Sequence, residues 1–261
     1  MKGTMRGIAV SLMLVSASVV VTACQSDPDI DITKLGVETD PPDVLYKQAL
    51  ANMNKGNMTE ASRKFEAIDK QYPFTEWGQK ALVMQTFIAT RTNKNDVAIT
   101  TGSRFLRQYP RSKDAAYVQY MIGLAYSKQI SDVTQDQRAA QRTVEAMNKV
   151  VNDYPDSEYV ADAQAKIRFA RDQLAGREMQ VGRYYLERKE YLAAVSRFRI
   201  VVEQYQNTNQ IEEALARLTE AYYAMGLVDE AQTAAAVLGN NYPDSQWYAD
   251  SYKLLKGQGL E

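Results

Sequence analysis

The stretch YPDSEYVADA at residues 154–163 recurs as YPDSQWYAD at residues 242–250, and shorter versions occur as YPFT at 72–75 and YPRS at 109–112. A fifth copy, YQNT at 205–208, has glutamine in place of proline. Proline cannot continue a helix, and it moves the residue before it out of helical geometry. A serine or threonine two residues later can cap the next helix by accepting a backbone N–H. The pattern therefore predicts five places where one helix ends and another begins.

Small and aromatic residues recur at fixed distances before these turns. In the fourth copy, Ala194 and Phe198 lie twelve and eight residues before Gln206, and Gly182 lies twenty-four before it. A small residue on a first helix lets a second helix approach closely, and the alanine and the aromatic ring fill the space between them. This resembles the tetratricopeptide repeat, a helix–turn–helix unit of about 34 residues. The sequence therefore predicts an all-α fold, an α-solenoid of five tetratricopeptide-like repeats.

Uneven spacing of the turns locates two insertions in the array. One lengthens the connection at 127–137, and the other lengthens a first helix over about 157–188, either continuous or broken near Gly176. Helices are expected to begin directly at the turn serine or threonine, as at 112, 157 and 208. The expected repeats, closed by a capping helix at 245–256 because terminal repeats need a closing surface, are 42–74, 75–111, 112–156, 157–207 and 208–244.

The N-terminus has the pattern of an exported chain. A short basic region precedes an apolar run of about 14 residues, 8–21, which is too short for a membrane span. The single cysteine follows in the order Val21-Thr-Ala-Cys24, which resembles the lipobox of bacterial lipoproteins. The resemblance implies a signal peptide at 1–23, cleavage before Cys24 and acylation of its thiol and new amine. The alternative is an ordinary signal peptide cut near Ala23.

An acidic segment follows the cysteine. Residues 25–41 hold five carboxylates, one lysine and two prolines, without helical or strand periodicity, so 24–41 is expected to be the acylated cysteine and a flexible tether. Gln25, rather than an aspartate, follows Cys24. In lipoproteins of Gram-negative bacteria this resembles the outer-membrane sorting pattern. The expected location is the outer membrane, lipid-anchored and facing the periplasm.

Composition excludes several kinds of function. The chain has no histidine and one cysteine, so it offers no Cys/His zinc site and no histidine general base. Its 31 basic and 32 acidic residues nearly balance, so the chain has no net positive electrostatic field that would attract nucleic acid. An enzyme that acts on peptidoglycan through two carboxylates is an alternative, but the repeats leave no room for a catalytic domain. The expectation is a non-enzyme without catalytic residues, metal or cofactor.

The combination of lipobox, acidic tether and five repeats resembles the BamD family, the lipoprotein subunits of the machinery that folds β-barrels into the outer membrane. Four motifs carry the resemblance: YPFT at 72–75, DAAYVQYMIGL at 114–124, YPDSEYVADA at 154–163, and EMQVGRYY at 178–185, which leads on to AAVSR at 193–197. The resemblance covers essentially the whole mature chain and departs from the pattern at Gln206. It implies a scaffold that binds the POTRA domains of a BamA-like barrel, other lipoproteins of the complex and unfolded outer-membrane proteins.

A different repeat lipoprotein, an adaptor of the cell-envelope or division machinery, is the alternative within binding modules. Such proteins usually carry a coiled-coil segment before the repeats. Residues 25–41 are too short and irregular to supply one.

Aromatic residues gather at the boundary of the first two repeats. Phe74 occupies the position that Arg111 and Asp156 take in other copies, and Trp77 follows it. The resemblance implies that this half receives the C-terminal signal of unfolded barrel proteins, so Tyr72, Phe74 and Trp77 are the substrate-peptide-binding candidates. Packing between repeats is the alternative, above all for Tyr72, whose equivalents recur in every repeat.

Two arginines in the fourth repeat are candidates for partner contact. Arg197 lies between Ala194 and Val201, at the border of the packed stripe, and arginine suits interface ion pairs because its planar fork holds a carboxylate with two hydrogen bonds. The resemblance implies that this half docks BamA, with Arg197 as a contact and Arg188, in the loop between the helices, as a second candidate. The alternative for both is an ordinary surface arginine.

Overall fold

The computed structural model describes residues 40–257, which form helices and turns without a strand in that range. The predictions for the signal peptide, Cys24 and nearly all of the tether lie outside the described residues. None of the described helices is both long and apolar enough to cross a membrane. The helices are α1 (Pro42–Asn54), α2 (Met58–Gln71), α3 (Glu76–Arg91), α4 (Asn95–Gln108), α5 (Ala115–Ser127), α6 (Arg138–Asp153), α7 (Val160–Glu187), α8 (Tyr191–Gln204), α9 (Ile211–Ala224), α10 (Val228–Asn241) and α11 (Gln246–Lys256).

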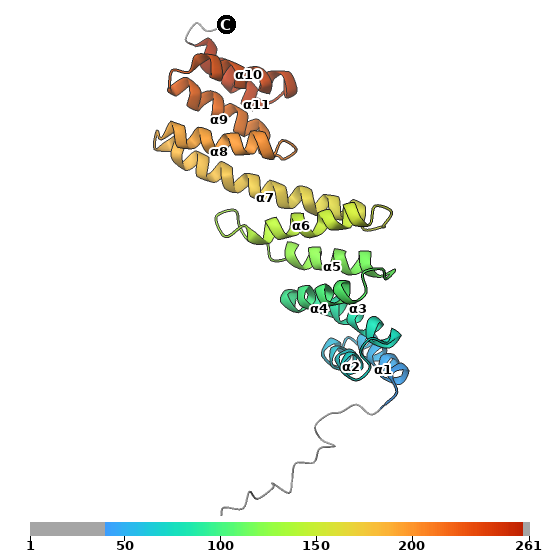
Figure 1. Ribbon diagram of the computed structural model, residues 1–261. Helices are drawn as coiled ribbons and strands as arrows, with labels where there is room; N and C mark the ends of the chain where they lie inside the picture. Colours follow the sequence, from blue (N-terminus) through green and yellow to red (C-terminus); the bar gives the residue numbers. More distant parts are fainter. Residues whose placement is uncertain (1–39, 258–261) are drawn as a thin grey trace, which may run out of the picture. The chain divides into compact units, whose positions relative to one another are not determined.

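Each helix packs against the next along the chain, so the helices pair as five hairpins with α11 at the end (Figure 1). The first helices of the early repeats also touch one another, α1 with α3, α3 with α5 and α5 with α7. No comparable close approach occurs between α7 and α9. The arrangement confirms the predicted all-α solenoid of tetratricopeptide-like repeats.

A tyrosine ends the second helix of every hairpin. Tyr72, Tyr109, Tyr154, Tyr205 and Tyr242 are all C-caps. Tyr205, which precedes glutamine, has φ −125° and ψ 37°, close to the φ −125° and ψ 50° of Tyr72, which precedes proline. The chain therefore makes this turn at Gln206 without the proline.

The predicted caps form at the two outer turns and differ at the three inner ones. The side chains of Thr75 and Ser245 accept backbone N–H groups at the starts of α3 and α11. At the inner turns the helices begin three residues later than expected, at 115, 160 and 211. There an extra turn intervenes: the hydroxyl of Ser157 accepts the N–H of Tyr159 at 3.3 Å, and the hydroxyl of Thr208 donates to the carbonyl of Tyr205 at 2.7 Å.

The predicted close approach of paired helices is present. A Cβ on Gly182 in α7 would lie 2.4 Å from Cε1 of Phe198 in α8, and one on Gly123 in α5 would lie 2.6 Å from the sulfur of Met147 in α6. Both Phe198 and Met147 are fully buried. The second helix therefore rests directly on the glycine of the first, which is why a small residue stands there.

The helix α7 is continuous through Gly176, so a break at that position does not occur. Gly176 is buried and faces the side chain of Val133, which belongs to the inserted segment between α5 and α6. In that segment the carboxylates of Asp132 and Asp136 accept the backbone N–H groups of Thr134 and Arg138. These hydrogen bonds hold the pKa of both carboxyls below the usual range.

Candidate interaction surfaces

Two of the three aromatic candidates in the N-terminal half are packed into the hairpins. The ring of Trp77 on α3 lies 5.4 Å from that of Tyr46 on α1, and the ammonium group of Lys80 lies 5.0 Å from the Trp77 ring. Tyr72 packs in the same apolar cluster, and its hydroxyl donates a 3.5 Å hydrogen bond to the carbonyl of Asp40. Both residues are partly buried.

Phe74, the third candidate, does not join the other two in the cluster. Its side chain is 76% exposed. Its backbone has φ 60°, a left-handed conformation that is rare for a bulky residue. The structure therefore presents an aromatic ring to solvent at the turn between the first two hairpins, beside the partly buried Trp77 and Tyr72.

A second aromatic group lies further along the first helices, and the sequence analysis did not single it out. The ring of Tyr159, at the start of α7, stacks on Tyr120 of α5 at 5.0 Å and lies 5.2 Å from Tyr117. The hydroxyl of Tyr120 donates a 2.7 Å hydrogen bond to Asp162. Burial, with a contribution from Glu158, raises the pKa of Tyr159 to about 12, so its hydroxyl stays neutral at physiological pH.

The arginine candidates of the C-terminal half each have a carboxylate partner within the chain. Arg197 on α8 forms a 3.1 Å ion pair with Glu178 on α7, and its side chain is 41% exposed. Arg188 forms a 3.0 Å ion pair with Glu190, and its guanidinium lies 5.4 Å from the ring of Tyr184. The structure does not bring the two arginines into one contact: Arg197 lies on a helix face, and Arg188 lies in the turn between α7 and α8.

Exposed apolar side chains surround that turn. Tyr184 is 54% exposed and Leu192 is 71% exposed. The corresponding turn of the next hairpin exposes Met225 and Leu227. Because successive helices run in opposite directions, the turns within hairpins lie at the same edge of the stack, so the C-terminal half has an apolar edge beside Arg188.

An apolar pocket of about 430 Å³ is lined by residues of α8, α9 and α10. The Arg199–Glu203 ion pair, at 2.6 Å, stands at its rim. Sequence periodicity gives no signal for such a pocket, because its walls come from three helices. Its apolar lining is Val202, Leu215, Leu218, Tyr222, Ala234 and Val237.

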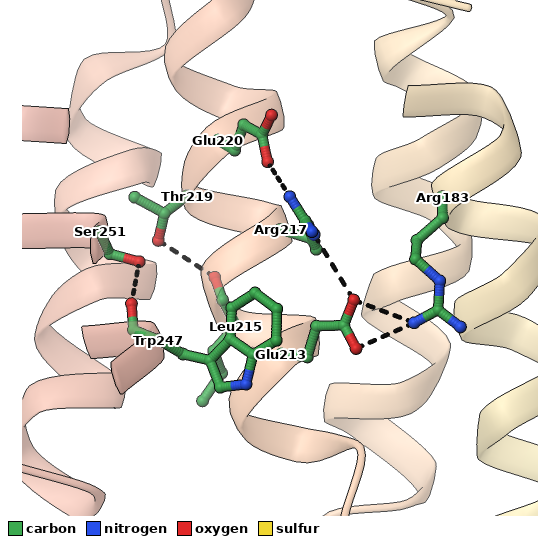
Figure 2. Close-up of polar contacts among 8 residues, drawn as sticks. All are labelled: Arg183, Glu213, Leu215, Arg217, Thr219, Glu220, Trp247 and Ser251. Carbon is green, nitrogen blue, oxygen red and sulfur yellow. Dashed lines mark hydrogen bonds and ion pairs between the residues drawn. The ribbon is translucent and has the colours of Figure 1, made fainter. Parts of the chain in front are cut away.

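A chain of ion pairs crosses the first helices of the last two hairpins. Figure 2 shows Glu213 on α9 between two arginines: Nη1 of Arg183 on α7 is 2.9 Å from its carboxylate, and Nε of Arg217 is 3.5 Å from it. Arg217 also pairs with Glu220 at 2.7 Å, and its guanidinium lies 5.2 Å from the ring of Trp247 on α11. This network links α7, α9 and α11 through side chains.

Comparison with known proteins identifies the family. A family model described as an outer membrane lipoprotein, YfiO, matches residues 38–238, which is most of the chain. The chain belongs to this family. A relative from Caulobacter vibrioides named outer membrane protein assembly factor BamD is 38% identical over 97% of this chain and 82% of its own length. The BamD of Rickettsia prowazekii is 34% identical, covering 93% of this chain and 95% of the relative.

The names of these relatives describe assembly factors and not enzymes, in line with the expectation from the sequence. Among solved structures, a tetratricopeptide-repeat protein of Thermus thermophilus aligns over 81% of this chain and 99% of its own, with 16% identity and a TM-score of 0.37.

Proposed function

We propose that this chain is a periplasm-facing scaffold of the outer-membrane β-barrel assembly machinery, anchored through acylated Cys24, that joins a BamA-like barrel and receives unfolded outer-membrane proteins. The observation that carries the proposal is membership of the YfiO family across residues 38–238, with BamD relatives that match nearly the full chain. Other lipoproteins of the complex are further partners in this proposal. The two halves of the array support different roles.

The N-terminal half offers a surface for an aromatic-ended peptide. Phe74 is solvent-exposed in the turn between Tyr72, which ends α2, and Trp77, in the first turn of α3. An aromatic pair is worth about 0.5–1.5 kcal/mol beyond the area that it buries, so an incoming ring gains by meeting Phe74 and the exposed part of Trp77. Tyr72, which is held by its hydrogen bond and by packing, shapes the site and contributes less contact.

The C-terminal half offers a surface for a protein partner. Arg197 and Arg188 keep part of each guanidinium accessible beside their internal carboxylates, and Tyr184 and Leu192 add apolar area near Arg188. Aromatic residues and arginines are enriched at the centres of protein interfaces. A BamA-like partner would bring a carboxylate to Arg197, because Glu178 occupies only one side of its fork.

The test is affinity purification of the native lipoprotein from solubilised outer membranes, as wild type and as Arg197→Glu. We expect a BamA-like barrel to co-purify with the wild type and to be reduced about tenfold with Arg197→Glu, since a charge reversal at an interface costs at least about 1.4 kcal/mol. Arg199→Glu is the matched control, because Arg199 lies on the same helix and pairs with Glu203 instead. Absence of any barrel partner from the wild-type sample refutes the proposal.

Circular dichroism spectra and melting curves of both variants establish that the helices persist. If the Arg197→Glu protein folds and retains the barrel at wild-type levels, Arg197 is not a contact. Loss of the barrel from both variants alike shows that general charge on α8, and not Arg197 itself, governs binding.

The lipid anchor has its own test. Cys24→Ser removes the thiol that acylation needs, and several acyl chains are what holds a lipoprotein firmly to a bilayer. We expect the variant to move from the membrane to the soluble fraction after cell breakage. Gln25→Ala, which leaves the cysteine in place, is the control and stays in the membrane fraction. Full retention of the Cys24→Ser protein contradicts the anchor.

A further inference from the structure

A pocket of about 620 Å³ lies where the turn that precedes α7 meets the start of α5. Three tyrosines line it, Tyr117, Tyr154 and Tyr159. The rings of Tyr117 and Tyr159 lie 5.2 Å apart with an interplanar angle of 30°, and because both residues line the cavity they form one wall of it. We call the cavity bounded by 113–117 and 153–159 the YPDSE pocket.

The YPDSE pocket has a strong excess of negative charge. One cation, Lys113, and four carboxylates are among its lining residues. Within residues 40–257 none of these carboxylates has an ion-pair partner, in contrast to Asp43, Glu76, Glu213 and Glu220 on other hairpins. The nearest lysine on α3, Lys80, is already paired with Glu76 at 2.6 Å. The four carboxylates are those of Asp114, Asp153, Asp156 and Glu158.

The helix dipole favours Asp114, the N-cap of α5, and Glu158, next to the N-terminus of α7, but it does not account for all of this acidity. The equivalent turn one repeat earlier, YPRSKD at 109–114, has the same tyrosine–proline start but carries Arg111 where this turn has Asp156, and Lys113 where it has Glu158. Asp153 is the last residue of α6, where the helix dipole disfavours an anion. A neutral or basic residue at 153 would suit the helix better, so the stability of α6 does not explain the charge of Asp153.

We propose that the YPDSE pocket binds the guanidinium or ammonium group of an arginine or lysine side chain in the peptide that the first helices receive. A cation over a tyrosine face is attracted by the negative face of the ring, and hydrogen bonds from a cation to carboxylates are among the strongest in proteins. The tyrosine wall supplies the first interaction and the surrounding carboxylates the second. The inference rests on the proposed function, because it assigns a second side chain of the same peptide.

Geometry sets the place of the basic residue in the peptide. Packed helices lie about 8–10 Å apart, so the pocket between α5 and α7 is roughly 12–15 Å from Trp77 on α3. An extended chain covers about 3.3 Å per residue, which corresponds to about four or five residues. The basic side chain is therefore expected about four or five positions before the aromatic residue at the end of the peptide, which Phe74 and Trp77 contact.

The probes are fluorescent peptides of about ten residues that end in phenylalanine, with either arginine or its neutral analogue citrulline about four or five positions earlier. Binding to the full-length lipoprotein in detergent is measured by anisotropy. We expect the arginine peptide to bind about tenfold more tightly than the citrulline peptide, and this preference to shrink as salt rises. The triple variant Asp153→Asn, Asp156→Asn, Glu158→Gln is expected to bind both peptides equally.

A matched pair of single variants separates the pocket from the turn. Asp156 and Asp244 occupy the same position in two copies of YPDS, but only Asp156 lines the pocket. Asp156→Asn is expected to reduce the arginine preference about threefold, and Asp244→Asn to leave it unchanged. These single variants decide the question if the triple variant melts abnormally.

The outcomes keep this inference and the proposed function apart. If arginine and citrulline peptides bind equally to the wild type while replacing the terminal phenylalanine weakens both, the pocket inference is wrong and the peptide surface stands. A preference for arginine that survives in the folded triple variant also overturns the inference. If no phenylalanine-ended peptide binds the wild type, peptide reception itself is wrong.

Discussion

At the scale of single residues, Phe74 is unusual among the left-handed positions of the chain. Within residues 40–257 the other positive-φ residues are Gly56, Asn93, Lys189 and Gly226, and each lies in a turn inside a hairpin. Phe74 alone lies in a turn between hairpins. A left-handed conformation costs a residue with a Cβ about 1–2 kcal/mol, and no packing of the exposed ring offsets it. Such strain at an exposed aromatic residue is consistent with selection for contact with a ligand.

Replacing Phe74 by asparagine separates stability from binding. Asparagine tolerates the left-handed region, so we expect Phe74→Asn to raise the free energy of unfolding by about 0.5–1 kcal/mol in urea titrations. Loss of the ring is expected to weaken binding of the phenylalanine-ended peptides about threefold to tenfold. Lys189→Asn is the control, because Lys189 has φ 61° in the turn between α7 and α8. The Lys189→Asn protein should gain similar stability with unchanged peptide affinity. If the Phe74→Asn protein binds the peptides as well as the wild type does, Phe74 is not part of the site.

At the scale of helices, the sequence predicted what local chemistry determines. The tyrosine and proline of each turn stop one helix, and the buried Ala194 and Phe198 mark the helix that packs on Gly182, so helix number and order could be read from spacing. The starts of the helices after the inner turns could not be read in this way, because the extra turn at Ser157 depends on backbone hydrogen bonds that several sequences can make. The tyrosine wall of the YPDSE pocket also could not be predicted from the sequence, since Tyr117 and Tyr159 meet only through the packing of α5 on α7.

Close packing of α8 on α7 makes Gly182 intolerant of a single methyl group. The added Cβ of Gly182→Ala would lie 2.4 Å from the ring of Phe198, which is fully buried. Overpacking costs about 1–3 kcal/mol, and alanine returns up to about 1 kcal/mol of helix propensity, so a net loss of about 1–2 kcal/mol is expected in thermal and urea unfolding.

Gly176→Ala is the control for that loss, because it adds the same methyl group to the same helix. Its Cβ would lie 3.2 Å from the side chain of Val133, which can yield because it belongs to the inserted segment. We therefore expect no loss of stability, or a gain of up to about 1 kcal/mol. Equal destabilisation by the two substitutions contradicts the role assigned to the Phe198 contact.

At the scale of the whole molecule, the candidate surfaces divide between the two halves of the array. The aromatic turn at Phe74 lies between the first and second repeats and the YPDSE pocket between the third and fourth, whereas Arg197, Arg188 and the apolar turn around Leu192 lie within the fourth. In a solenoid each repeat contacts only its neighbours, so coupling between the halves passes through the repeat boundaries one at a time. The boundary between α7 and α9 differs from the earlier ones because those two helices lack a close backbone approach.

The ion pair between Arg183 and Glu213 spans that boundary, so we expect Glu213→Gln to loosen the last repeat selectively. The carboxylate of Glu213 is 17% exposed, and its loss leaves Arg183 and the half-buried Arg217 with one partner fewer. The free energy of opening, measured by hydrogen exchange, is expected to fall by about 1–3 kcal/mol in α9, α10 and α11 and to stay unchanged in α1 and α2.

Glu145→Gln is the matched control for Glu213→Gln, because Glu145 pairs with Arg142 at 2.9 Å on an open surface where both side chains are about 60% exposed. Exposed pairs contribute about 0–1 kcal/mol, so its effect on exchange should be small. If Glu213→Gln loosens α1 and α2 as much as α9 to α11, the array opens as one unit. The boundary between α7 and α9 is then no weaker than the others, which contradicts the prediction. Selective loosening of the last repeat instead means that a partner docked across α7 and α9 would stiffen the C-terminal end, because such a partner would span the boundary where the first helices lack a close backbone approach.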